Sequence, residues 1–193
     1  MFVILLLGHY PKLRGIGKKN KNTISSKYVL MTYYNILSAY GEELFLDKCD
    51  EAGVYGLIIP DLPYELTKKF KKEFYHHSVK IISLIAMTAS DDRIMQIAKN
   101  SEGFIYTVTM NATTGNSGEF HPDLKRKIEY IKKVSKIPVV AGFGIKNPEH
   151  VKDIASVADG IVIGSEIVKR IEIDSRKEFI TYIKSIRTTL NSL

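Results

Sequence analysis

The chain has 193 residues, of which 45% are hydrophobic and 25% are charged, a composition typical of one globular domain with a sizeable core. Its net charge of +7 and pI of about 9.3 would suit a nucleic-acid-binding protein, but the lysines are scattered over expected helix surfaces. The one loop-like basic run, residues 18–21, has no zinc-finger or RNA-binding motif beside it, so we expect no nucleic-acid partner. The single cysteine, Cys49, excludes an internal disulfide and suggests helix packing.

No apolar stretch reaches the length of a membrane-spanning helix, and none of the five histidines has the spacing of a metal site. The apolar residues 1–7 lack the basic region and cleavage site of a signal peptide, and we expect them to form a buried strand. His76 and His77 are expected to end a helix, where a cation suits the helix dipole, while His150 stands isolated. We therefore expect a soluble cytoplasmic protein with no metal and no membrane partner.

Continuous apolar, β-branched runs, typical of strands covered on both faces, alternate along the chain with amphipathic helical runs. The expected strands are residues 2–7, 28–33, 56–59, 80–86, 104–109, 138–141 and 160–163. The expected helices are residues 42–52 ending at Gly53, 65–77, 90–100 with Ser90 as N-cap, 122–135, one opened by Asn147 and Pro148, and one opened by the capping box of Ser175 and Glu178.

This alternation predicts parallel βαβ units and an α/β protein. The best match is a (β/α)₈ TIM barrel, but only six to seven strands are recognisable, and a full barrel typically needs about 250 residues. The shortage lies in residues 8–27, an irregular basic segment too short for a helix, a strand and a second helix. We expect one incomplete barrel domain over residues 1–193, either N-terminally truncated or internally deleted.

Two late strands, residues 138–141 and 160–163, both open into glycine turns at Gly144 and Gly164. In a (β/α)₈ barrel the loops after the seventh and eighth strands, with a short helix, are the usual phosphate site. Glycine lets the backbone approach a phosphate, and N–H groups with the helix dipole attract it. Gly144, Gly164 and Ser165 are therefore candidate phosphate-binding residues. The alternative is that they are simple turn residues.

Five motifs in register carry a resemblance to a known family. They are LMTYYN at 30–35, AGVYGLIIPDLP at 52–63, TTG at 113–115, AGFGI at 141–145 and ADGIVIGS at 158–165. From about residue 28 to the C-terminus the chain resembles the alpha subunit of tryptophan synthase. The resemblance implies a barrel lyase that cleaves indole-3-glycerol phosphate to indole and glyceraldehyde 3-phosphate. It also implies no cofactor in this chain and a heterotetramer with a beta subunit, whose pyridoxal phosphate condenses indole with serine.

The resemblance also suggests roles for residues in the substrate site. Gly115 joins the phosphate-binding set, and Tyr106 faces the substrate unless it simply fills the barrel. Thr114 positions the catalytic acid from a loop that closes over the substrate and excludes water. Phe143 and Ile58 shape the indole pocket, or are plain core.

Two further residues fit a role in communication with the beta subunit. Asp61 follows a strand between two prolines, at the face where barrel enzymes place their chemistry. The alternative is a simple turn aspartate. Asn35 is expected at a strand end, where hydrogen bonding to a neighbouring loop is the favoured interpretation.

The family's catalytic acids are not found. Retro-aldol cleavage needs groups that move protons at the indole ring and at the glycerol hydroxyl. The family uses a glutamate on its second strand and an aspartate in the loop after it, whereas residues 8–27 contain no Asp or Glu. We therefore expect no catalytic residue here, impaired activity and marginal stability of the free monomer.

Two functions stay open from the sequence. The first is a tryptophan synthase alpha chain in tryptophan biosynthesis, active or once active. The second is a non-catalytic phosphate-binding partner or activator of the beta subunit, which keeps the contact surface but not the chemistry. The register of all five motifs disfavours a different phosphate-sugar lyase or isomerase of the barrel superfamily.

Overall fold

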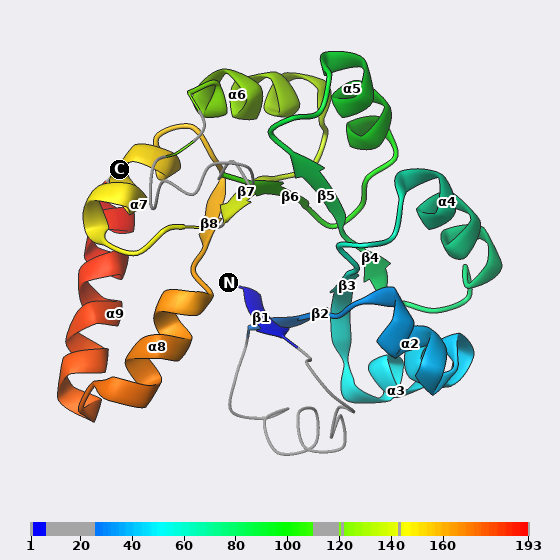
Figure 1. Ribbon diagram of the computed structural model, residues 1–193, viewed down its shortest axis with the longest axis horizontal. Coiled ribbons are helices and arrows are strands. Elements are labelled where there is room, and N and C mark those ends of the chain that lie inside the picture. The colour runs from blue at the N-terminus through cyan, green and yellow to red at the C-terminus, as the bar shows by residue number, and fades with distance from the viewer. Residues whose placement is uncertain (1, 7–25, 110–119, 121, 143, 193) are drawn as a thin grey trace. The chain divides into compact units, whose positions relative to one another are not determined.

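The computed structural model describes residues 2–6, 26–109, 120, 122–142 and 144–192. Strands and helices alternate along the chain, from blue to red in Figure 1. Backbone contacts group the chain into two compact units, Met1–Ser83 with Ser101–Gly103, and Leu84–Asn100 with Phe104–Leu193. A single domain over residues 1–193 stays a prediction, as does the irregular segment 8–27, most of which lies outside the described residues.

The first unit contains a four-stranded sheet in the order β1-β2-β3-β4. Its elements are β1 (Phe2–Leu6), β2 (Lys27–Met31), α2 (Tyr34–Tyr40), α3 (Glu42–Ala52), β3 (Val54–Ile58), α4 (Tyr64–Glu73) and β4 (Lys80–Ile81). All three strand pairs are parallel, and β1 pairs with β2 from Phe2 opposite Lys27 to Leu6 opposite Met31. The strand beside β2 is therefore β1, so the apolar start of the chain is a strand as expected.

The core of the first unit lies between the sheet and its helices. Leu30 and Leu57 from the strands pack with Phe45, Cys49 and Phe70 from the helices, all of them buried. Burial raises the pKa of the Cys49 thiol to about 12, so the thiol stays protonated and acts as a small apolar group. The packing role expected for this cysteine is confirmed.

The second unit contains the sheet β5-β6-β7-β8. Its elements are β5 (Ser83–Ala86), α5 (Asp91–Lys99), β6 (Ile105–Val108), α6 (Leu124–Val134), β7 (Val139–Gly142), α7 (Pro148–Ala155), β8 (Gly160–Val162), α8 (Ser165–Ile173) and α9 (Arg176–Asn191). The β6–β7 and β7–β8 pairs are parallel. Apolar side chains from both element types, including Ile94, Ile105, Ile128, Val139 and Val151, form its buried core.

The helix-end signals in the sequence are confirmed where the capping partners are local. Gly53 ends α3 in the left-handed conformation at φ 70°. Ser90 and Asn147 accept hydrogen bonds from the first turns of α5 and α7. Ser175 opens α9 in a complete capping box.

Three expected elements differ from the structure. The expected strand 80–86 is two strands, because its first part pairs with β3 and its second part with β6. The expected helix 65–77 ends at Glu73, where the Phe74 N–H closes the last turn on Phe70, so His76 and His77 lie beyond the helix end. The expected strand 28–33 ends at Met31, and the unexpected helix α2 begins at Tyr34.

Candidate functional site

The turns after β7 and β8 lie at the same level of the second unit's sheet. Gly142, the last residue of β7, pairs with Val162, the last residue of β8, in parallel register. Gly144 and Gly164 each follow two residues later, and neighbouring strands lie only about 4.8 Å apart. The register therefore brings together the two glycine turns that the sequence singled out.

The β7–α7 turn is shaped by its own residues. Gly144 has a φ of 74°, a left-handed conformation that favours glycine. Asn147 caps α7 by accepting a hydrogen bond of 2.9 Å from the His150 N–H. The ring Nδ1 of His150 lies 3.2 Å from the Gly144 carbonyl oxygen, and the ring packs edge-on against Phe120. His150 looked isolated in the sequence, yet its ring and its backbone N–H both contact residues of this turn.

The β8–α8 turn ends in a helix N-terminus. Gly164 occupies the N-cap position, and its carbonyl accepts the Val168 N–H at 3.1 Å. Ser165 is the first helical residue, so its N–H belongs to the first turn, whose donors have no partner within the helix. A Cβ on Gly164 would meet no atom within 4 Å, so this glycine leaves open space rather than relieving a clash.

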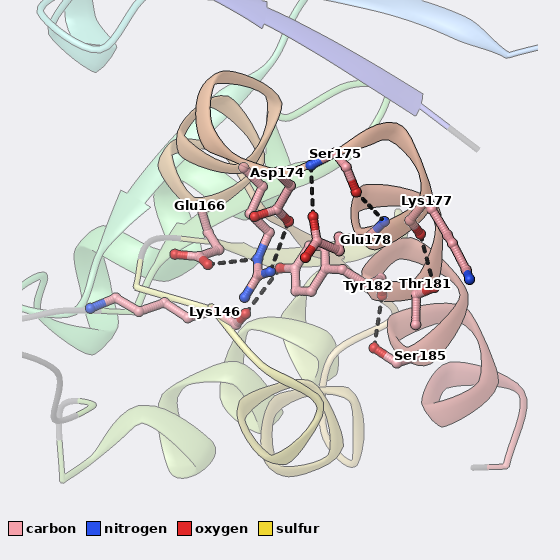
Figure 2. Close-up of polar contacts among 10 residues, drawn as sticks. Lys146, Glu166, Asp174, Ser175, Lys177, Glu178, Thr181, Tyr182 and Ser185 are labelled. Atoms are coloured by element: carbon pink, nitrogen blue, oxygen red, sulfur yellow. Dashed lines mark hydrogen bonds and ion pairs between the residues drawn. The ribbon is translucent and has the colours of Figure 1, made fainter.

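A polar cluster connects α8 to the loop after β7 (Figure 2). The Arg170 guanidinium donates to Glu166 at 2.8 Å and to Asp174 at 3.1 Å, and it lies 4.0 Å from the centre of the Tyr182 ring. The Tyr182 hydroxyl donates to the Lys146 carbonyl at 3.0 Å. Because Lys146 lies just beyond Gly144, this cluster joins α8, through α9, to the β7–α7 turn.

Strand β6 borders the same edge. Tyr106 is buried, and its ring and hydroxyl occupy the space over Gly142 on β7. Burial raises the pKa of Tyr106 to about 12, so its hydroxyl stays protonated at neutral pH and can donate a hydrogen bond. Thr109, just past the strand, donates its buried hydroxyl to the Gly142 carbonyl at 3.0 Å. The sequence did not single out Thr109, since a lone threonine at a strand end carries no signal.

The first unit holds the other described site residues. Ile58 is the buried last residue of β3, which fits either of the two roles expected for it. The Asp61 carboxylate, three residues on, accepts the Tyr34 N–H at 2.9 Å. Tyr33 occupies the N-cap position of α2, but its side chain makes no capping hydrogen bond. Asp61, 27 residues beyond Tyr34, provides the capping acceptor instead. Asn35 lies exposed within α2, which corrects its expected place at a strand end.

The remaining expected site residues, Thr114, Gly115 and Phe143, lie outside the described residues. No strand in the described part of the chain contains an aspartate or a glutamate. Within the described ranges, no helix is long and apolar enough to cross a membrane.

Parallel βα units with paired glycine turns after β7 and β8 define this chain as a protein of the (β/α) barrel class. The family model described as "Tryptophan synthase alpha chain" matches residues 13–191. The chain belongs to the tryptophan synthase alpha chain family. Tryptophan synthase alpha chains are lyases of tryptophan biosynthesis that act on indole-3-glycerol phosphate. They have no cofactor of their own, and the pyridoxal phosphate is in the beta subunit.

Curated relatives are similar over most of the chain. A tryptophan synthase alpha chain from Staphylococcus epidermidis is 99% identical over 175 residues, which cover 91% of this chain and 72% of the relative. One from Staphylococcus aureus is 62% identical over the same shares. Strand β1 lies before residue 13, where the family match begins.

Solved structures confirm the TIM barrel fold. The tryptophan synthase alpha chain from Legionella pneumophila has a TM-score of 0.78 at 27% identity, covering 94% of this chain and 69% of that one. The subunit alpha from Campylobacter jejuni has a TM-score of 0.73 at 29% identity, covering 85% and 66%. The resemblance to the alpha subunit of tryptophan synthase is thereby confirmed.

Proposed function

We propose that this chain serves tryptophan biosynthesis as an alpha chain that grips the phosphate of indole-3-glycerol phosphate at the turns after β7 and β8. The observation that carries the proposal is the Gly142–Val162 register, which places two glycine turns side by side. The helix dipole of α8 and the N–H groups of its first turn favour an anion there. Gly144, Gly164 and Ser165 are the proposed phosphate ligands, with Gly115 from the loop after β6.

The proposed pocket around the indole ring uses the remaining residues of the family pattern. Tyr106 borders the site from β6, and its raised pKa keeps the hydroxyl protonated as a hydrogen-bond donor. Thr114, Phe143 and Ile58 complete the pocket in this proposal. Asp61 and Asn35 face the partner, the beta subunit, and a cytoplasmic location goes with this pathway.

We propose further that these 193 residues cleave indole-3-glycerol phosphate poorly. Cleavage requires a base at the glycerol hydroxyl and an acid at the indole ring carbon. No described strand carries a carboxylate, residues 8–27 contain none, and β1 stands beside β2 in the sheet. The same lack of carboxylates in these segments favours the second candidate function, a non-catalytic activator of the beta subunit.

Two assays separate these functions. The first follows indole release from indole-3-glycerol phosphate by the purified chain, and we expect negligible release. The second titrates the chain into a tryptophan synthase beta subunit and follows tryptophan formation from serine and indole. Stimulation without cleavage supports the activator. Cleavage at an ordinary enzymatic rate overturns the proposed impairment. If the chain shows neither cleavage nor stimulation, both proposed functions are overturned.

Phosphate binding is tested by two substitutions at one position. Since Gly164 faces open space, we expect Gly164→Ala to fold and to bind glycerol 3-phosphate in NMR titrations. Gly164→Asp places a carboxylate at the turn and should abolish binding by charge repulsion. Equal binding by both variants would contradict a phosphate site at this turn.

A further inference from the structure

A cluster of metal-binding side chains lies in the first unit, away from the residues assigned above. It joins Glu43 on α3 to His76 and His77 in the turn after α4. The Glu43 Oε1 atom lies 2.9 Å from His76 Nε2 and 3.4 Å from His77 Nε2. One donor atom from each of the three residues falls within 4.8 Å of the others.

His77 is the residue that points to a ligand. Its side chain is only 4% exposed, and its Nε2 atom has no hydrogen-bond partner among the described residues. Its Nδ1 atom lies 2.7 Å from Asp50 Oδ2, so a neutral ring donates its proton to Asp50. The Nε2 lone pair then faces the Glu43 carboxylate oxygen. Two lone pairs at that distance repel each other, and a cation between them removes the repulsion.

The carboxylate behind His77 is itself held in place. Asp50 Oδ1 accepts hydrogen bonds from the Ser78 backbone N–H and hydroxyl, which fixes the side chain in position. A histidine whose second nitrogen donates to a carboxylate is the usual arrangement around protein-bound zinc, because it fixes the ring and makes it more basic. Asp50 and His77 have this arrangement before any metal binds.

The distances also suit a small transition-metal ion. Zinc lies about 2.0–2.1 Å from histidine nitrogen and about 2.0–2.2 Å from a carboxylate oxygen. In a tetrahedral site such ligands stand roughly 3.3 Å apart. The observed separations of 2.9 and 3.4 Å from Glu43 lie on either side of that value. Two imidazoles and one carboxylate form a donor set that zinc accepts.

We propose that Glu43, His76 and His77 bind one divalent transition-metal ion, most suitably Zn²⁺, with a water molecule as the fourth ligand. The ion would link α3 to the turn after α4. In its absence the contact between Glu43 and His76 joins two largely exposed side chains, at 57% and 49% exposure. Exposed pairs contribute little to stability, so metal binding is expected to raise the unfolding temperature.

The test uses the untagged 193-residue chain after treatment with a chelator. Titration with Co²⁺, which occupies zinc sites and reports their geometry by visible absorption, is expected to saturate at one equivalent. Zn²⁺ should then displace the cobalt and abolish the absorption. A chain that shows no saturable cobalt spectrum and no zinc-dependent rise in melting temperature would overturn the proposal.

Variants identify the ligands. His76→Gln and Glu43→Gln change half-exposed side chains, so they should fold, and each should weaken cobalt binding at least tenfold. Asp50→Asn, which can affect the metal only by way of His77, should weaken cobalt binding about 10–100-fold. Glu51→Gln on the same helix and His150→Gln in the second unit are matched controls that should bind like the parent chain. Unchanged binding by His76→Gln and Glu43→Gln together would place the metal elsewhere and refute the site.

Discussion

The ring of Tyr106 fills the space that a side chain on Gly142 would need. A Cβ atom on Gly142 would lie 2.4 Å from both the Cε2 atom and the hydroxyl oxygen of Tyr106. Such contacts are far inside van der Waals distance, so either the ring or the strand would have to move. The β6–β7 pair is therefore packed most favourably with a glycine at the last position of β7.

We expect Gly142→Ala to lower the free energy of unfolding by about 1–3 kcal/mol, the usual cost of overpacking a core. Urea unfolding measures it. Gly160→Ala is the matched control, because its Cβ would meet Val140 at an ordinary 3.4 Å. In the Gly142→Ala background, Tyr106→Ala should cost less than it does alone, and strictly additive effects would contradict the contact.

Lys127 connects α6 to the segment after β5. Its side chain is buried, and its ammonium donates to the Met87 and Ala89 carbonyls. Lys127→Met keeps the length of the side chain but leaves two carbonyls without this donor, so we expect a loss of about 2 kcal/mol in unfolding free energy. Lys125→Met, on the exposed face of the same helix, should change it by less than about 0.5 kcal/mol. Equal losses in the two variants would show that the buried hydrogen bonds of Lys127 do not stabilise the fold.

Asp50 predicts an acid-dependent contribution to stability. Burial tends to raise the pKa of Asp50, but hydrogen bonds from Ser78 and His77 outweigh it, and the pKa is lowered overall. The folded chain then binds this proton less readily than the unfolded chain. The stabilisation is present above the ordinary aspartate pKa of about 3.9 and is lost as the pH falls through the folded value.

With a chelator present, the stability difference between the parent chain and Asp50→Asn should therefore be present at about pH 5 and shrink below about pH 4. Denaturant titrations at each pH measure it. A difference that grows toward acid would mean that the folded pKa is raised instead.

Asp61 can be separated into its capping role and its proposed role toward the beta subunit. Asp61→Ala removes the acceptor for the Tyr34 N–H and should cost about 1 kcal/mol of stability, as the loss of a helix cap does. Asp61→Asn keeps an acceptor oxygen and should be nearly as stable as the parent chain. If the charge serves communication, Asp61→Asn should still reduce stimulation of the beta subunit. Stimulation equal to that of the parent would leave only the capping role.

The features that could be predicted from sequence are those whose causes are local. Gly53, Ser90 and Asn147 act on residues within one helical turn, so each was visible in a short window. Helix α2 was missed because its cap, Asp61, lies 27 residues away and its own N-cap position holds Tyr33. No short window contains both partners.

The same reason explains why the sequence did not reveal the cluster of Glu43, His76 and His77, or the role of His150 in the turn after β7. His76 and Glu43 are 33 residues apart, and only the packing of α3 near the turn after α4 brings them together. The pattern Gly142–Gly144 could be recognised because glycine itself signals a special backbone position. His150 could not, because its role depends on a carbonyl that any residue possesses.

Strand β1 illustrates that a sheet and the chemistry of its side chains have different requirements. A parallel ladder is held by main-chain amides, which every sequence supplies, so residues outside the family match can complete the row next to β2. Proton transfer depends instead on particular side chains, such as carboxylates, at particular positions. Almost any apolar segment can thus extend a parallel sheet, whereas a catalytic activity requires that the segment also carry the right side chains.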